Sequence, residues 1–171
     1  MTHTFKPAPF GTVSHGTLRT EDLLDSFARE LEWQVQRNAD YFQSDDVRRA
    51  ERDRLLSLVW DARECDPESE DADYLVNESL PDALQAFAPA YSYFGAHCGD
   101  GSDFGFWLSD DALEDFDGLR VADTSEVPAD YCGEVLHVND HGNMTLYAAT
   151  AGQLVEVWGV LWPAQWQGNH R

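Results

Sequence analysis

The sequence predicts an α+β fold in which about three N-terminal helices pack on one face of a C-terminal antiparallel sheet of about five strands. Apolar residues recur at helical spacing between positions 17 and 88, whereas short β-prone runs separated by turn residues occupy positions 90–162. Helices followed by antiparallel strands are typical of an α+β domain. With 171 residues, one domain over 1–171 is expected, ending in a tail at 163–171.

Two long helices are expected in the first third of the chain. The first sixteen residues contain two prolines and two glycines, so they are expected to be irregular. Thr20 is a good N-cap, and the apolar spacing after it predicts a helix over 21–37. A second helix is predicted over 45–64, because Ser44 and the acids after it repeat the start signal. Its arginines alternate with acids at spacings that support a helix.

A third helical stretch follows a loop around Pro67 and ends at Pro89. Pro81 is expected to kink this helix or split it in two, with Ser79 capping the second piece. Its apolar face comprises Leu75, Val76, Leu80, Ala83, Leu84 and Phe87.

Strands are expected in two hairpins and one closing strand. The five expected strands are 91–96, 104–108, 134–138, 144–148 and 154–162. Glycine, aspartate and serine residues form the loop of the first hairpin, and a short acidic helix capped by Ser109 follows it. The second hairpin turns at 139–143, where Gly142 is free to adopt a positive φ.

Alternation along the later strands predicts which side chains face the helices. The expected inward-facing residues are Leu136, Val138, Met144, Leu146, Val155, Val157 and Leu161. The opposite face would have His137, Tyr147 and Trp158, with Trp107 beside them. Half-exposed aromatic residues near acids are typical of interface hot spots, so Trp107, Tyr147 and Trp158 are candidate partner-binding residues. The alternative is that these aromatic side chains form a second small core beneath the loops.

Net charge is the most unusual property of the chain. Thirty-two acids against eleven bases give a formal charge of −21, and the only lysine is Lys6. Duplex DNA has this much charge in about 36 Å of its length. A compact chain of this size is about 40 Å across, so the protein and DNA have similar charge per unit length. The chain is therefore expected to repel nucleic acid and anionic membranes and to attract basic surfaces.

The acids are concentrated in two runs. Nine acids lie in 61–82 beside one base, Arg63, and seven lie in 100–117 without a base. The candidate partner-binding acids are Asp66, Glu68, Glu70, Asp71, Asp73, Asp100, Asp103, Asp110, Asp111, Glu114, Asp115 and Asp117. General solubility or adaptation to a high-salt cytoplasm is the alternative explanation of this charge.

Composition favours a cytoplasmic protein without a metal or disulfide framework. No apolar run approaches the roughly 20 residues that span a bilayer, and the first ten residues lack the features of a secretory signal. The three cysteines, Cys65, Cys98 and Cys132, are odd in number and include no CxxC pair.

A few residues are capable of catalysis or metal binding. Cys98 with His97, His137 or His141 and an orienting Asp140 is compatible with a hydrolase, and the three histidines with a metal site. No local signature accompanies them, and phosphate-binding and nucleophile-elbow motifs are missing from the sequence. We therefore predict no catalytic, cofactor-binding or metal residue and no cofactor. The negative charge excludes a basic platform for nucleic acid.

Three segments, 16–23, 93–107 and 138–143, resemble a group of small acidic proteins carried by bacterial phages, plasmids and integrated mobile elements. The segments read GTLRTEDL, YFGAHCGDGSDFGFW and VNDHGN. No activity is established for that group, so the resemblance implies no catalytic residue. It implies a context, because small accessory proteins of mobile elements often counter host defences.

These observations lead to three hypotheses. The first is a non-enzymatic inhibitor of the anti-CRISPR or anti-restriction type, which mimics DNA and occupies the basic nucleic-acid-binding surface of a host protein in the host cytoplasm. It would contact neither nucleic acid nor membrane directly. The second is an ordinary acidic binding or assembly module without mimicry, and the third is a Cys/His hydrolase or metal-binding protein.

Overall fold

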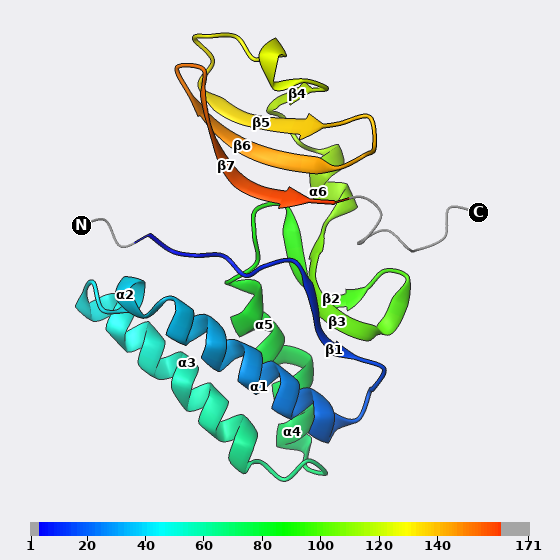
Figure 1. Ribbon diagram of the computed structural model, residues 1–171. Coiled ribbons are helices and arrows are strands. Elements are labelled where there is room, and N and C mark those ends of the chain that lie inside the picture. The colour runs from blue at the N-terminus through cyan, green and yellow to red at the C-terminus, as the bar shows by residue number, and fades with distance from the viewer. Residues whose placement is uncertain (1–3, 162–171) are drawn as a thin grey trace. The chain divides into compact units, whose positions relative to one another are not determined.

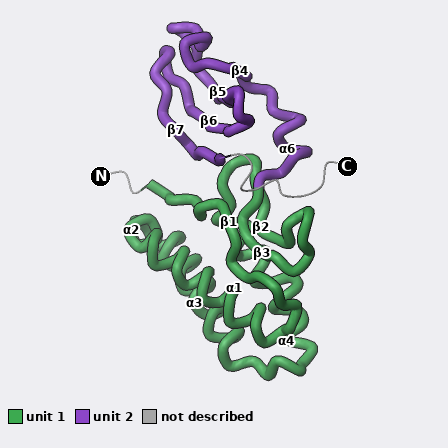
Figure 2. Tube along the Cα trace, turned by 45° about the vertical axis from the view of Figure 1, so that its right-hand side comes forward, with its two compact units in different colours: residues 1–107 green, residues 108–171 purple. Residues whose placement is uncertain are grey.

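The structure, a computed structural model, describes residues 4–161. It divides into two compact units, the first over 1–107 and the second over 108–171 (Figure 2). Each unit has its own cluster of packed apolar side chains. Because helices and strands are both present, the α+β class is confirmed, whereas a single domain over 1–171 stays a prediction.

The first unit combines a helical layer with a small sheet (Figure 1). Its strands are β1 (Gly11–His15), β2 (Ser92–His97) and β3 (Asp100–Leu108). Its helices are α1 (Thr20–Arg37), α2 (Ala39–Phe42), α3 (Asp46–Glu64), α4 (Glu70–Tyr74), the π-helix η1 (Leu75–Ser79) and α5 (Leu80–Gln85). Helix α1 packs against α3 and α5. Both long helices match the segments that the apolar periodicity predicts.

The start of α1 differs from the prediction. Thr20 is the first helical residue, and the N-cap position belongs to Arg19, whose side chain makes no capping hydrogen bond. The hydroxyl of Thr17 instead donates to the Asp22 carboxylate at 2.6 Å, which ties the preceding segment to the first turn. Helix α3 begins one residue later than predicted, with Asp45 and not Ser44 as its N-cap, and the Asp45 side chain accepts from the Arg48 amide at 2.8 Å.

The third helical stretch is not split at Pro81, because helical residues continue through it from Glu70 to Gln85. A π-helical turn, η1, joins α4 directly to α5, and Pro81 lies in the first turn of α5. Ser79 does not cap the second piece, because it has helical φ and ψ and the helix continues through it. Ser69 caps α4 instead, accepting from the Ala72 amide at 3.1 Å.

The small sheet has the order β1-β3-β2, with β1 antiparallel to β3. The prediction that the first sixteen residues are irregular is therefore wrong for Gly11–His15. Two glycines permit this pairing: Gly11 has a φ of +133°, and a Cβ on Gly105 would lie 2.1 Å from the Gly11 carbonyl oxygen. The turn between β2 and β3 is only Cys98 and Gly99, shorter than the expected loop.

Aromatic side chains join this sheet to α1. Phe27 is fully buried, and its ring meets those of Phe94 and Phe104 edge to face at centroid distances of 5.1 and 5.5 Å. Phe106 is also buried and contacts Phe94. These contacts make one continuous core in the first unit.

The second unit contains a four-stranded sheet of order β4-β5-β6-β7. Its elements are α6 (Asp110–Glu114), β4 (Leu119–Val121), the 3-10 turn η2 (Thr124–Glu126), β5 (Gly133–Val138), β6 (Met144–Thr150) and β7 (Gln153–Val160). Strand β4 is parallel to β5, and the other pairs are antiparallel. The described strands therefore form two sheets, and the prediction of one antiparallel sheet of about five strands is wrong. With only three residues, β4 is too short to show a period of two.

The β5–β6 turn is confirmed. Gly142 has a φ of +78°, and the Asn139 side chain accepts from the amides of His141 and Asn143 at 2.9 and 3.0 Å. Such bonds are the usual way in which asparagine stabilises a tight turn. Ser109 likewise caps α6 as expected, accepting from the Ala112 amide.

The predicted faces of the second sheet need correction. A register shift between Leu146 and Tyr147 pairs Leu146 with Trp158, which places Trp158 on the face of Leu146 and buries it. One extra residue in a strand reverses the alternation that follows it. Val155, Val157 and Leu161, all expected to face the helices, are exposed.

Candidate binding groove

Most arginines in the first unit form ion pairs with acids of the same unit. Seven pairs link them to acids outside the two acidic runs. The pairs are Arg19–Glu21, Arg29–Asp25, Arg48–Asp45, Arg49–Asp46, Arg52–Asp53, Arg54–Glu51 and Arg63–Glu32. Hydrogen bonds from Arg63 and Arg54 lower the pKa values of Glu32 and Glu51, with desolvation opposing in each case. The positive charge of α1 and α3 is thus largely compensated within these helices.

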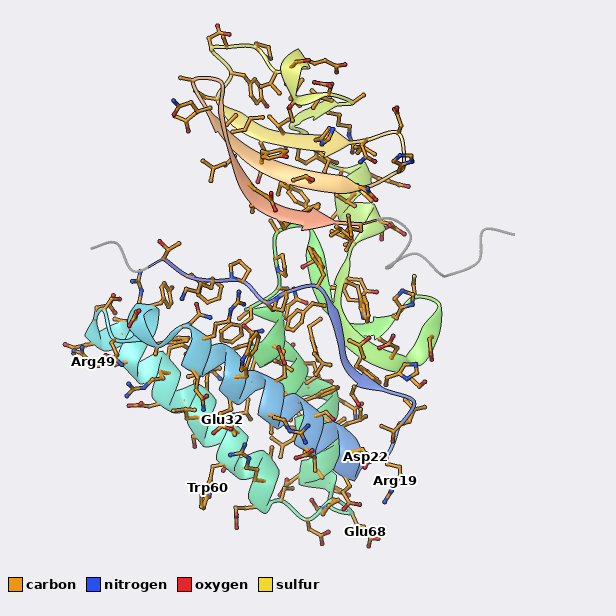
Figure 3. All side chains as sticks on the ribbon, viewed as in Figure 1. Arg19, Asp22, Glu32, Arg49, Trp60 and Glu68 are labelled. Carbon is orange, nitrogen blue, oxygen red and sulfur yellow. The ribbon has the colours of Figure 1, made fainter. Side chains whose placement is uncertain are left out.

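The acids of 61–82 are all exposed, and within residues 4–161 none of them forms an ion pair. They occupy the C-terminal end of α3 and the segment through α5, whereas the arginine cluster occupies the N-terminal half of α3. Figure 3 shows this separation, with Arg49 near one end of α3 and Glu68 beyond the other. Asp66, Glu68, Glu70, Asp71 and Asp73 therefore form an uncompensated anionic surface on the first unit, which we call the acidic end.

The second acidic run is divided between the units. Asp100 and Asp103 lie on β3 in the first unit, whereas the remaining acids lie in the second unit. Asp110, Asp111, Glu114, Asp115 and Asp117 are those exposed remaining acids. Hydrogen bonds from the amide and hydroxyl of Ser102 lower the pKa of Asp100, and His15 Nε2 lies 3.5 Å away. Asp103 is only half-exposed, with one buried carboxylate oxygen that has no hydrogen-bond partner among the described residues.

Of the three predicted aromatic anchors, Trp107 and Trp158 are buried, whereas Tyr147 is half-buried. Trp107 and Trp158 are 6% and 7% exposed. The Trp107 indole donates to the Gly95 carbonyl at 3.0 Å, and its ring contacts His97. Tyr147 packs against the small core of the second unit, which agrees with the alternative of a second core.

Two other aromatic residues, Trp60 and Tyr74, are instead 64% and 65% exposed. They flank a groove of about 510 Å³ between the end of α3 and the α4–η1 segment. The residues lining the groove are Leu58, Trp60, Asp61, Glu64, Cys65, Asp71, Tyr74, Leu75 and Ser79. Figure 3 shows the Trp60 side chain projecting from α3 on the side away from α1. Such a site can bind a planar cation, because the carboxylates pair with its charge and the rings contact its flat face.

Local structure explains why these rings are exposed. Helix α3 buries Leu55, Val59 and Ala62, and Trp60 follows Val59 by one step, about 100° around the helix. Tyr74 ends α4 immediately before the π-helix, and two π-helical residues, Leu75 and Ser79, line the groove. Single π-helical turns occur frequently at functional sites.

Sequence reasoning identified Asp71 but missed the two rings of this groove. A signal was available, because Trp60 lies off the apolar stripe of its helix and Tyr74 precedes the stripe that begins at Leu75. Cys65, which was assigned no role, lies in the groove with its Sγ 3.3 Å from the Ser69 hydroxyl.

The residues of the hydrolase hypothesis are divided between the two units, with His97 and Cys98 in the first and His137, Asp140 and His141 in the second. Cys98 is exposed in the β2–β3 turn, where the Gly99 amide donates to His97 Nδ1 at 3.0 Å. Asp140 and His141 lie in the β5–β6 turn of the other unit. His137 Nε2 lies 3.0 Å from the Ala122 carbonyl oxygen. Within residues 4–161, no group of three or more His, Cys, Asp or Glu side chains is placed to hold a metal ion.

Comparisons with family models, curated proteins and solved structures find no match for this chain. The resemblance to mobile-element proteins therefore stays a prediction. Among the described residues, no helix combines the length and the apolar character needed to cross a bilayer.

Proposed function

We propose that this chain is a non-enzymatic acidic inhibitor that occupies the basic nucleic-acid-binding surface of a host protein. One observation supports this proposal above the others. Arg29 of α1 and the arginines of α3 are compensated by nearby acids, while the acidic end has exposed carboxylates without a cation among the described residues. The excess charge is therefore available to a partner.

The physical basis is the exchange of phosphates for carboxylates. A surface that binds DNA presents arginine and lysine side chains, which form ion pairs with carboxylates as well as with phosphates. Opposite charge accelerates the encounter, and salt weakens it. An inhibitor of the anti-CRISPR or anti-restriction type would use this competition to displace DNA, in keeping with the mobile-element resemblance.

An ordinary acidic binding module is the second candidate. The groove between Trp60 and Tyr74 favours it, because a groove of this kind binds a short segment without requiring an extended mimic of DNA. The two candidates differ in whether the acidic end beyond the groove contributes to binding.

Competition with DNA tests the proposal. A CRISPR effector and a restriction enzyme, each bound to fluorescent duplex DNA, would be titrated with the full chain at low and high salt. We expect DNA release that weakens steeply as salt rises. Neutralising five acids outside the groove should weaken release about tenfold at low salt. Four of these changes are in the acidic end, namely Asp66→Asn, Glu68→Gln, Glu70→Gln and Asp73→Asn, and the fifth is Asp82→Asn at an exposed position of α5. Together they are called the acidic-end variant.

A control variant has the same net charge but leaves the acidic end intact. Its changes are Asp40→Asn, Glu126→Gln, Asp130→Asn, Asp140→Asn and Glu156→Gln, all at exposed positions. Release of DNA should be nearly unchanged in this control. Equal losses in both variants, or no release by the unmodified chain, would contradict the proposal.

A further inference from the structure

We infer that the groove between Trp60 and Tyr74 binds an arginine side chain of the partner, with the guanidinium against the two rings and paired with the carboxylates beside them. This inference deepens the proposed function by naming a contact, and it rests on that function for the choice of a basic protein as the partner. The groove itself is defined by α3, α4 and η1, all within the first unit.

The aromatic residues supply the first argument. Elsewhere on the described surface, rings are covered by the chain's own arginines: the Arg37 guanidinium lies 5.3 Å from the Trp33 ring centre, and that of Arg48 lies 4.2 Å from the Tyr41 ring centre. Within residues 4–161, Trp60 and Tyr74 have no such cation, although they are the more exposed rings. Exposed aromatic rings beside anions attract guanidinium groups.

The carboxylates supply the second argument. Asp61, Glu64 and Asp71 line the groove, and none of them forms an ion pair within the described part of the chain. The only arginine in this run, Arg63, is directed to Glu32 on α1, with an Nη2–Oε2 distance of 2.6 Å. Three like charges around one groove repel one another, so a cation bound there gains attraction and relieves that repulsion.

Shape and apolar surface favour arginine over lysine. The volume of about 510 Å³ is within the usual range of binding pockets, and Leu58 and Leu75 offer apolar surface to an aliphatic stem. A guanidinium is planar, stacks on rings and donates five hydrogen bonds, which suits two rings and several carboxylates. A lysine ammonium is a compact, strongly hydrated charge that gains less from the rings.

A peptide-binding experiment tests the inference on the full chain. The probe is a fluorescent ten-residue peptide with arginine at alternate positions and serine between, compared with the lysine counterpart by fluorescence polarisation. We expect the arginine peptide to bind several-fold more tightly than the lysine peptide. Trp60→Ala and Tyr74→Ala should each weaken its binding about tenfold, and Trp60→Phe by less.

Trp33→Ala is the matched control, because Trp33 is an exposed tryptophan on α1 outside the groove. It should leave peptide affinity unchanged. Trp60 and Tyr74 are mostly exposed, so their replacement should leave the melting temperature near that of the unmodified chain, as circular dichroism would show.

Two variants that each neutralise two aspartates and one glutamate distinguish the effect of net charge from the effect of position. The first combines Asp61→Asn, Glu64→Gln and Asp71→Asn in the groove. The second combines Asp130→Asn, Asp140→Asn and Glu156→Gln in the second unit, where all three acids are exposed. Only the groove variant should lose peptide affinity, by tenfold or more.

Several results would overturn the inference. These are no peptide binding, equal affinity for both peptides, equal loss in the two charge variants, unchanged affinity in Trp60→Ala and Tyr74→Ala, or occupation of the groove by a second copy of the chain. Failure of the proposed function has a different signature: the groove variants lose peptide affinity as expected, but the chain never releases DNA from a basic protein.

Discussion

The exposed positions of Trp60 and Tyr74 at the groove reduce the stability of the isolated chain. Burying a large apolar side chain typically contributes about 1.5–3 kcal/mol, and Trp60 and Tyr74 forgo most of it because about two-thirds of each side chain remains exposed. Trp107, by contrast, is buried and has a hydrogen-bond partner for its indole. Exposed aromatic residues next to uncompensated acids contribute more to the binding of a partner than to the stability of the fold.

A backbone position in the β6–β7 turn leads to a residue-level prediction. Ala151 and Gly152 have φ values of +49° and +75°, and a turn with two positive φ values favours Asn-Gly. Ala151→Asn should therefore raise the free energy of unfolding by about 1 kcal/mol. Thermal unfolding followed by circular dichroism measures the change. Ala148→Asn, at an exposed strand position, should bring no such gain, and a loss of stability in Ala151→Asn would contradict the expectation.

Among the elements, α1, α3 and the β5–β6 hairpin were predictable from sequence. Their signals are local: apolar side chains at helical spacing, the Asp45 cap and the turn at Gly142. The pairing of β1, the π-helical turn η1 and the bulge beside Leu146 were not predictable, because each depends on the approach of segments distant in the chain or on side-chain packing.

The ion pair between α1 and α3 gives an element-level prediction. The hydrogen bond from Arg63 lowers the pKa of Glu32 below its usual 4.5, although desolvation opposes the shift. A lowered carboxyl pKa adds stability above about pH 4.5, and this stability is lost as the pH falls through the folded-state pKa. Because both side chains are partly exposed, we expect a coupling of about 0.5 kcal/mol at pH 7 and none at pH 2.

A double-mutant cycle measures this coupling. Urea unfolding of the unmodified chain, Glu32→Gln, Arg63→Met and the double variant at the two pH values provides it. A coupling of equal size at pH 2 would contradict the pKa argument.

At the scale of the whole molecule, charge is the dominant property. A formal charge of −21 makes the folded chain repel itself, most strongly where acids cluster without cations. The acids of the acidic end are exposed and repel one another, so the core of the first unit must offset this repulsion.

This repulsion predicts a salt dependence of stability. Raising sodium chloride from 0.02 to 0.3 M should raise the melting temperature by about 3 °C, because screening weakens repulsion among the acids. The acidic-end variant should show a smaller rise, since its charge is five units less negative. Differential scanning calorimetry measures both. An equal rise in the two proteins would indicate that these acids do not contribute to the repulsion.

The sequence by itself determined the α+β class, the two long helices, the principal hairpin turn and the large negative charge, because these follow from composition and from neighbours within a few residues. Tertiary structure decided which aromatic rings are buried, how strands divide between two sheets and which acids lack a cation. Burial and charge pairing depend on long-range packing, which the periodicity of a single segment does not specify. For that reason the candidate groove contains Trp60 and Tyr74 and not the buried Trp107 and Trp158, while Asp71 belongs both to the groove and to the acids expected from the sequence.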